Sequence, residues 1–378
     1  MNRLIIISCV AILVASSSPR RSLTSDFTGD LRTLIDTSAN DSNIGILLHV
    51  ESPDHGISWS GAAGYSDFER KVRLHEDQCF RIASVTKTFV ATSILRLWEE
   101  GKLSLNDPIS KYLKEDHCTI LKRGGYNPDR ITVNHLLTHS GGLNDHTNAR
   151  EFFDQVRTNP SHVWTRTEQL EGLVSWLKPV GIPGERFSYS DSGYILLGEI
   201  LENITGKSMY DAFTELIGFS KLGLTGTTIE DAVNPVSNPS CRIHQYSKGE
   251  DTYNWNCSLD LYGGGGLLST TRDLSTFYRA LFHGKVFTHS STLDTMLVKT
   301  TYLSKDKPKL DYRKGIFLVR LSDTDAWTHT GYWGTQVVYL PELDLTMATN
   351  YSDRWQRRGQ APVLEYAAAL FKRRFGNK

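Results

Sequence analysis

A serine three residues before a lysine can act as a nucleophile beside its base, and this chain of 378 residues contains three such pairs. One pair starts at Ser175 in an apolar helical stretch, and another at Ser304 in the charged run SKDKPK. Ser84 and Lys87 instead stand where an extended apolar segment meets an amphipathic stretch that predicts a buried helix. A helix start stabilises an oxyanion, and burial can leave a lysine neutral enough to accept the serine proton. Alternatively, Ser84 caps the helix and Lys87 is an ordinary first-turn residue.

Two further segments contain groups that could act with this pair. Tyr189 precedes a predicted helix that begins near Ser192, and its phenol could move protons if a neighbouring cation lowers its pKa. Asp191 is predicted to cap that helix. His329 opens a predicted strand and could titrate near neutral pH, and the glycines at 331 and 334 would let a ligand approach the backbone.

A zinc site is the competing interpretation of the segment HLLTHSGGLND. His135, His139 and Asp145 have the spacing of a zinc-protease helix and turn, but Leu136 stands where such a site needs a glutamate as general base. The run GGGGLL at 263–268 lacks the Gly-Lys-Ser/Thr ending of a phosphate loop. We therefore expect no metal and no cofactor.

Composition and the N-terminus restrict the partners and the location. The chain has 42 basic and 42 acidic residues, so no strong field favours nucleic acid or an anionic membrane. Residues 1–18 resemble a signal peptide, because one early arginine precedes an apolar run too short to span a membrane. We expect a secreted or periplasmic protein that acts on a small-molecule or peptide substrate. Acylation at Cys9 and an uncleaved anchor are the alternatives.

Export would allow disulfides among the cysteines that remain after cleavage. Cys241 and Cys257 flank a polar segment and could form a bridge. The alternative is four independent buried thiols, which include Cys79 and Cys118.

The order of predicted elements indicates an α+β fold. A helix is predicted over 26–38, followed by strands over 44–50 and 57–67. The middle of the chain consists of helices and loops, and strands return at 314–321, 335–343 and 345–351 before a final amphipathic helix. We expect one antiparallel sheet built from both chain ends, with flanking helices and an inserted, mostly helical domain.

Three motifs follow one another along the chain: Ser84-x-x-Lys87, Tyr189-Ser-Asp191 and His329-Thr330-Gly331. With longer segments such as ITVNHLLTHSGGL, this order resembles the penicillin-recognising serine hydrolases, specifically the class C β-lactamase and D-alanyl-D-alanine carboxypeptidase/esterase family. The resemblance extends over residues 26–372. It implies a β-lactamase/transpeptidase-like fold with a sheet subdomain (26–83 and 262–372) and a helical subdomain (84–261).

The resemblance also implies roles for single residues. Ser84 would attack a carbonyl group, and Lys87 and Tyr189 would share the general-base and general-acid work. His329 would stand where the family often has lysine, and the backbone N–H groups of Ser84 and Tyr332 would form an oxyanion hole. The implied substrate-binding residues are Asp191, Thr330, Gly331 and Tyr332.

Two departures from the family pattern bear on the substrate. Asp191 stands where the family has asparagine, and an ionised carboxylate cannot donate a hydrogen bond to a substrate amide. Asp191 could instead pair with Lys87 or His329 and raise their pKa values, or favour a cationic group on the substrate. His329 replaces a fixed cation and weakens recognition of a substrate carboxylate. We therefore expect a secreted serine hydrolase that acts through an acyl-enzyme on an ester or an amide, such as a D-amino-acid peptide. A catalytically silent binding homologue is the alternative, and a true β-lactamase is favoured less.

Overall fold

The computed structural model describes residues 23–40, 45–234, 240–304, 310–355 and 363–376. The predicted signal peptide, with Cys9, lies outside these residues. Within the described part of the chain, no helix combines the length and the apolar character that crossing a membrane requires.

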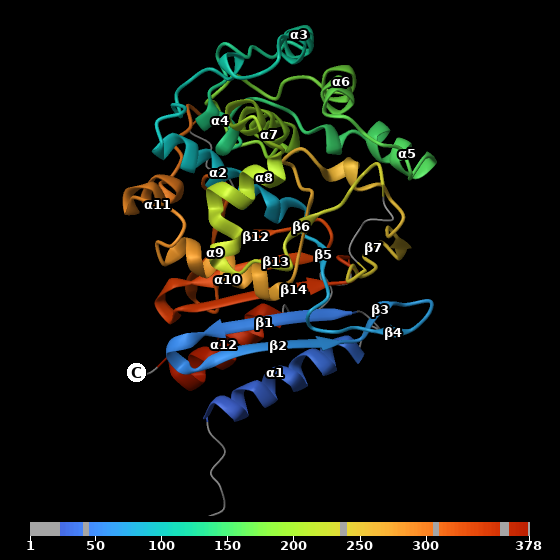
Figure 1. Ribbon diagram of the computed structural model, residues 1–378, viewed down its shortest axis with the longest axis vertical. Coiled ribbons are helices and arrows are strands. Elements are labelled where there is room, and N and C mark those ends of the chain that lie inside the picture. Colours follow the sequence, from blue (N-terminus) through green and yellow to red (C-terminus); the bar gives the residue numbers. More distant parts are fainter. Residues whose placement is uncertain (1–22, 41–44, 235–239, 305–309, 356–362, 377–378) are drawn as a thin grey trace, which may run out of the picture.

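A seven-stranded antiparallel sheet forms the centre of the molecule, and both ends of the chain contribute to it (Figure 1). The first strand pairs with the last, Ile46 opposite Tyr351, which confirms the expected sheet. The order across the sheet is β10 (Asp311–Tyr312), β11 (Phe317–Leu321), β12 (Thr324–Thr330), β13 (Thr335–Leu340), β14 (Leu345–Tyr351), β1 (Ile46–Ser52) and β2 (Ile57–Ala63).

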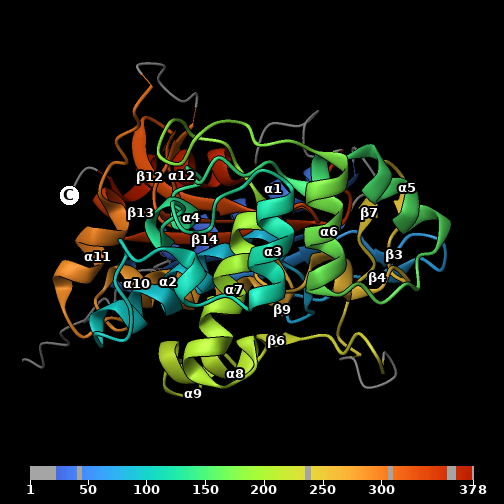
Figure 2. The same ribbon diagram turned by 90° about the horizontal axis from the view of Figure 1, so that it is seen from above.

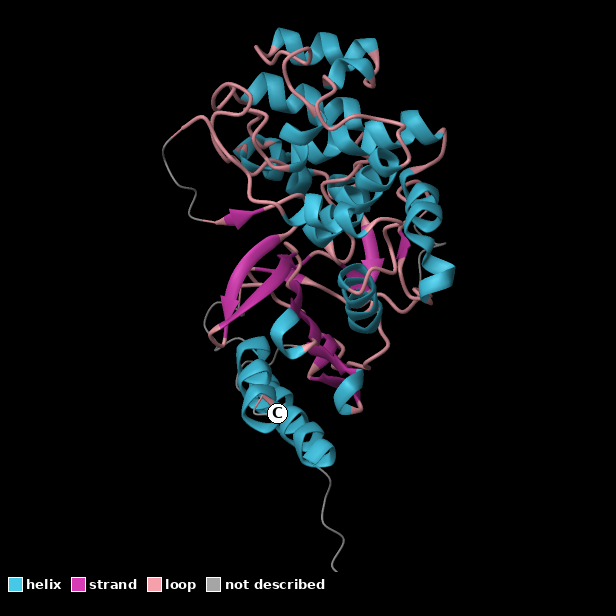
Figure 3. Ribbon diagram, turned by 90° about the vertical axis from the view of Figure 1, so that its left-hand side faces the viewer, coloured by secondary structure: helices cyan, strands magenta, loops and turns pink. Residues whose placement is uncertain are grey.

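Helices from both chain ends cover one face of this sheet. α1 (Leu23–Asn40) and α12 (Val363–Phe375) lie together on that face, while α10 (Thr271–Phe282) covers the other (Figures 1 and 3). α1 buries Phe27 and Leu31, one helical turn apart. The Phe27 ring meets those of Phe371 and Phe375 at 5.8 and 5.6 Å. The two terminal helices therefore share one hydrophobic core.

The helical part lies on the side of α10 away from the sheet (Figure 1), and its helices lie in front of the strands in the view from above (Figure 2). α2 runs through it and packs against α7. Its elements are α2 (Thr86–Glu99), α3 (Glu115–Arg123), α4 (Val133–Leu137), α5 (Arg150–Thr158), α6 (Arg166–Trp176), α7 (Asp191–Thr205), α8 (Met209–Phe213), a π-helical turn (Thr214–Gly218), α9 (Phe219–Leu222) and, later in the chain, α11 (Ser290–Leu297).

Seven short strands lie outside the central sheet among the described residues. Three of them form one small sheet in the order β5-β9-β6, and the other four form two separate pairs. These strands are β5 (Phe80–Arg81), β9 (Leu267–Ser269), β6 (Thr228–Ile229), and the pairs β3 (Tyr65–Asp67) with β4 (Val72–Arg73) and β7 (Tyr246–Ser247) with β8 (Glu250–Asp251). The single strand predicted over 57–67 is thus two strands, β2 and β3, which are separated by Gly64 with φ +82°.

The cysteine pairing differs from the suggested one. Cys79 forms a disulfide with Cys241, with their Cα atoms 5.4 Å apart. Cys118 and Cys257 are buried free thiols. The Cys241–Cys257 bridge is therefore wrong, because backbone hydrogen bonds in both directions hold Cys79 beside the segment of Cys241.

Candidate active site

Ser84 lies on a tight turn between a strand and a helix. A 3-10 turn, Ala83–Val85, connects β5 to α2, and Ala83 adopts a left-handed conformation with φ +46°. From Arg81 to Leu95 every residue is buried except Ser84, which is partly exposed. The turn therefore presents the hydroxyl at the start of a buried helix, as the sequence predicts.

Gly331 lets the end of β12 approach this turn. A Cβ atom at Gly331 would lie 2.2 Å from the carbonyl oxygen of Ile82. On the side where a Cβ would stand, Gly331 is therefore approached by the protein's own backbone, while the residue also lines the pocket described below. Gly334 is comparable, since its Cβ would meet the Tyr351 carbonyl oxygen at 2.1 Å.

Lys87 is fully buried one turn after Ser84. Its Nζ donates to Ser84 Oγ at 3.0 Å and to the carbonyl oxygen of Gly264 at 2.5 Å. An Asp191 carboxylate oxygen lies 2.5 Å from the same nitrogen. An ammonium group has three N–H donors, and this environment uses all of them within the protein. Gly264 has no signal in the sequence, because it contributes a backbone carbonyl.

These contacts overturn the expectation that burial leaves Lys87 neutral. Burial lowers the pKa of the ammonium group, but the charges and hydrogen bonds of Asp191 and Tyr189 outweigh it and hold that pKa above its ordinary value. Lys87 is therefore protonated in the resting site.

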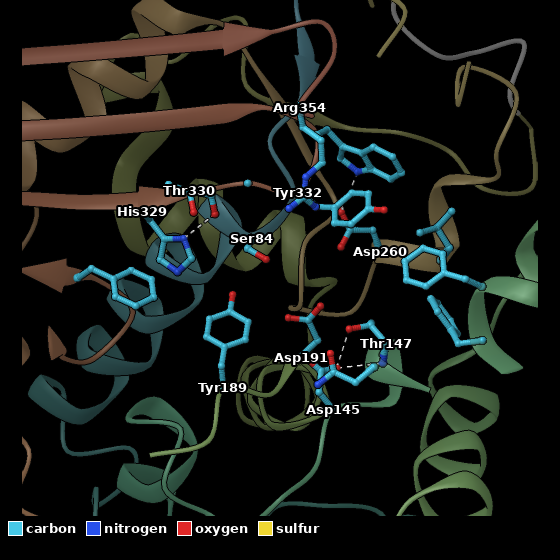
Figure 4. A pocket seen from close by; sticks show the side chains of 17 residues that line it. Ser84, Asp145, Thr147, Tyr189, Asp191, Asp260, His329, Thr330, Tyr332 and Arg354 are labelled. Atoms are coloured by element: carbon cyan, nitrogen blue, oxygen red, sulfur yellow. Dashed lines mark hydrogen bonds between the residues drawn. The ribbon is translucent and has the colours of Figure 1, made fainter. Parts of the chain in front are cut away.

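Tyr189 points its hydroxyl toward Ser84 (Figure 4). Burial raises its pKa to about 12, although the neighbouring Lys87 ammonium opposes the rise. The expectation that a cation would lower the pKa of this phenol is therefore wrong, since desolvation is the larger effect. At neutral pH the phenol retains its proton.

His139 holds the segment that contains Tyr189. Its carbonyl oxygen accepts from the Ser188 N–H at 2.8 Å, and its Nδ1 accepts from the Ser190 N–H at 3.1 Å. The rings of His139 and Tyr189 lie 4.2 Å apart. His139 is buried, with φ +51°. This residue contacts both sides of Tyr189 and is thus a positioning residue that the sequence did not identify.

The cap of α7 also differs from the prediction. Ser190 is the N-cap, because its hydroxyl accepts from the Gly193 N–H at 3.2 Å. Asp191 is the first residue of the helix, which leaves its carboxylate directed at Lys87. An acidic residue in the first turn also interacts favourably with the helix dipole.

His329 lies near the end of β12 rather than at the start of a strand. Its Nδ1 is 2.9 Å from the carbonyl oxygen of Thr330, which can only accept, so the proton is on Nδ1. Burial and the Lys87 charge lower the pKa of His329 to about 3, against the hydrogen bond to Thr330. The expectation of titration near neutrality is wrong, because the ring is buried beside a cation.

A pocket of about 390 Å³ opens above these groups (Figure 4). It is lined by Ser84, Tyr189, Asp191 and His329, so the structure brings three distant motifs together. The sequence missed several other lining residues, which come from separate helices, strands and turns and have no local signal. The pocket is also lined by the expected residues Thr330, Gly331 and Tyr332, by Asp145, which the sequence assigned only to a zinc site, and by the unexpected residues Asp260, Phe153, Phe317 and Arg354.

The zinc interpretation does not match this geometry. α4 ends at Leu137, so His135 and His139 do not share a helix face. The Nδ1 atom of each ring already accepts a backbone N–H, from Thr132 and Ser190 respectively. Among the described residues, no group of three His, Cys, Asp or Glu side chains could hold a metal ion.

Known proteins similar to this chain agree on one family. A family model described as Beta-lactamase matches residues 52–370. The chain is 29% identical over 225 residues to D-alanyl-D-alanine-carboxypeptidase/endopeptidase AmpH of Escherichia coli (strain K12), covering 60% of this chain and 54% of that protein. It is 28% identical over 281 residues to Penicillin-binding protein 4* of Bacillus subtilis (strain 168), covering 69% and 57%. The chain thus spans about half the length of these relatives.

A similar fold occurs in a D-stereospecific amidohydrolase from Streptomyces sp.. The structures superpose with a TM-score of 0.74 at 24% sequence identity, over 93% of this chain and 99% of the other. At this identity the likeness establishes the fold alone, and it confirms the β-lactamase/transpeptidase-like architecture.

Proposed function

The chain belongs to the beta-lactamase family of serine hydrolases, and on that premise we propose that it hydrolyses an ester or an amide through an acyl-enzyme formed on Ser84. The observation that supports this proposal best is the contact of 3.0 Å between Lys87 Nζ and Ser84 Oγ at the base of an open pocket. A nucleophile held beside a proton-transfer group is the arrangement that covalent catalysis requires.

The resting protonation state determines how Ser84 loses its proton. Since Lys87 is an ammonium group, it must first pass a proton to another base. The Asp191 carboxylate, at 2.5 Å, is placed to receive it. As the Oγ–H bond breaks, the serine proton moves to Lys87 Nζ while a Lys87 proton moves to Asp191. Serine then attacks the carbonyl carbon, Lys87 remains positively charged, and the site gains no net charge.

Tyr189 is then available as the general acid. Its phenol keeps its proton at neutral pH and can donate it to the leaving group, after which Lys87 restores the phenol's proton and takes back the proton held by Asp191. The backbone N–H groups of Ser84 and Tyr332 are proposed to receive the developing oxyanion. Water then attacks the acyl-enzyme with the same groups acting in reverse.

We also propose that the protein is exported. The signal-like sequence at 1–18 supports this proposal, as does the disulfide between Cys79 and Cys241, since such bonds persist mainly in oxidising compartments. Fractionation of cells that express the full chain, followed by N-terminal sequencing of the mature protein, tests it.

The first test is the variant Ser84→Ala. We expect it to fold normally and to lose hydrolysis of p-nitrophenyl acetate by about a thousandfold or more, because the acyl-enzyme cannot form. Initial rates and a thermal melt measure both properties. Retained ester hydrolysis would refute the role of Ser84.

The protonated state of Lys87 gives one reason to test a second function, binding without catalysis. A fluorophosphonate probe distinguishes the two, because it labels a serine only when that serine is nucleophilic. We expect the wild type to gain one probe mass and Ser84→Ala to gain none. If neither is labelled, the chain is a binding homologue.

A further inference from the structure

Three carboxyl groups line the pocket beside Ser84, and they differ in how well the protein satisfies them. Asp191 is paired with Lys87. Asp145 accepts from the N–H and the hydroxyl of Thr147, at 3.0 and 2.9 Å. Asp260 accepts one long hydrogen bond, 3.3 Å, from the Trp333 indole. Asp260 is therefore the one of these three carboxyl groups that has neither an ion pair nor a short hydrogen bond among the described residues.

His329 is a second residue in the pocket that could accept a hydrogen bond from a ligand. His329 Nε2 is buried, and it has no hydrogen-bond partner among the described residues. The ring lines the pocket and lies beside Ser84 and Tyr189 in Figure 4. Because Nδ1 holds the proton, Nε2 presents a bare lone pair. A ligand that satisfies it must donate an N–H or an O–H.

No hydrogen bond or ion pair between described residues joins a cation to Asp260. Lys87 uses its donors inside the protein. The Arg354 guanidinium lies over the Tyr332 ring at 4.0 Å, and Figure 4 shows it across the pocket from Asp191 and Asp145. Burial and the Asp191 charge raise the pKa of Asp260 to about 7. The raised pKa means that a negative charge on Asp260 is unfavourable beside the charge of Asp191. A cation beside Asp260 would remove that cost.

We propose that the substrate carries a protonated amine near its scissile carbonyl, and that Asp260 receives this ammonium group. The proposal rests on the proposed function, because it names the substrate class of the same site. The class is an amino-acid amide, ester or peptide with a free amine. An N-acylated substrate lacks the cation, and a carboxylate group near Asp260 would meet negative charge without a lysine to receive it.

The test compares two substrates that differ only at the amine, phenylalanine p-nitroanilide and its N-acetyl form, each as the D and the L enantiomer. We expect kcat/KM to favour the free amine by about tenfold or more in at least one enantiomer, the scale of a charge-assisted hydrogen bond. Asp260→Asn should reduce this ratio by a similar factor. Asp54→Asn, at an exposed position in the 3-10 turn Pro53–His55, should preserve it and serves as the matched control.

A binding measurement on the wild type keeps the proposal testable if Asp260→Asn misfolds. Benzylamine, which stays protonated, should inhibit more strongly as the pH rises from about 6 to about 8, because Asp260 ionises over this range. The charged groups that act on Asp260 are Asp191, Lys87 and Arg81. Benzyl alcohol, which has no charge, should show no such change.

The outcomes separate this inference from the proposed function. If the wild type hydrolyses the N-acetyl substrate as well as the free amine, or benzylamine inhibition is independent of pH, the ammonium site is refuted while Ser84 remains the nucleophile. If no ester or anilide is hydrolysed, both proposals are refuted.

Discussion

At the scale of single residues, the site depends on protonation states that the side chains impose on one another. Asp191 keeps Lys87 charged, Lys87 and burial keep His329 neutral, and burial keeps Tyr189 protonated. Tyr189, the proposed general acid, does not have a lowered pKa, so its contribution depends on the position of its hydroxyl beside Ser84. That positioning comes from His139.

We predict that His139→Ala lowers kcat by about ten- to a hundredfold, because loss of the Nδ1 acceptor frees the Ser190 N–H and lets Tyr189 shift. His139→Asn should retain most of kcat, since asparagine tolerates positive φ and its amide oxygen can accept the same N–H. Steady-state kinetics on p-nitrophenyl acetate separates kcat from KM.

The control for this prediction is His135→Ala, in the same helix–turn segment and also bonded through Nδ1 to a backbone N–H. It should leave kcat near the wild-type value. If His139→Ala only lowers thermal stability and its folded fraction keeps the wild-type kcat, His139 is a structural residue and not a positioning one.

At the scale of elements, β5 supports the catalytic turn through a buried charge cluster. Arg81 in β5 forms a bidentate pair with Glu230, at 2.5 and 3.2 Å, and Arg242 contacts the same carboxylate at 3.0 Å. All three side chains are less than 10% exposed. The single carboxylate pairs with both buried guanidinium groups just before the turn that contains Ser84.

We predict that Glu230→Gln destabilises the protein by about 3–5 kcal/mol, because it leaves buried cations uncompensated. Urea denaturation followed by circular dichroism measures this change. Glu250→Gln, which removes an exposed pair with Arg157, should cost less than about 1 kcal/mol. Equal effects of the two variants would contradict the structural role of the cluster.

The sequence predicted elements where the apolar pattern was strong and failed where that pattern was weak. The helix that begins beside Ser84 and the strands at both chain ends were predicted, since their apolar patterns are local. β12 was not predicted as a full strand, because its sequence TDAWTHT is mostly polar. Asp260 was missed because no local pattern in the sequence marks it. Only the packing of its loop against Asp191 and Trp333 makes it part of the site.

At the scale of the whole molecule, the disulfide joins cysteines 162 positions apart and connects the strand before Ser84 to a distant loop. We predict that Cys79→Ser with Cys241→Ser lowers the free energy of unfolding by about 2–5 kcal/mol, because the unfolded chain gains conformational freedom. Thermal melts measure this change. Dithiothreitol should lower the melting temperature of the wild type but not of the double variant. No change on reduction would contradict the pairing.

The meeting of the two chain ends in one sheet has a consequence for how the protein is made. β14 lies between β13 and β1, so the hairpin of β1 and β2 has no partner until nearly the whole chain has been synthesised. Contacts so distant in sequence close slowly. A growing chain that ends before β12 lacks His329, so no such partly synthesised form has the complete pocket. If the chain is exported as we propose, this late closure of the sheet favours its passage through a translocation channel before it folds.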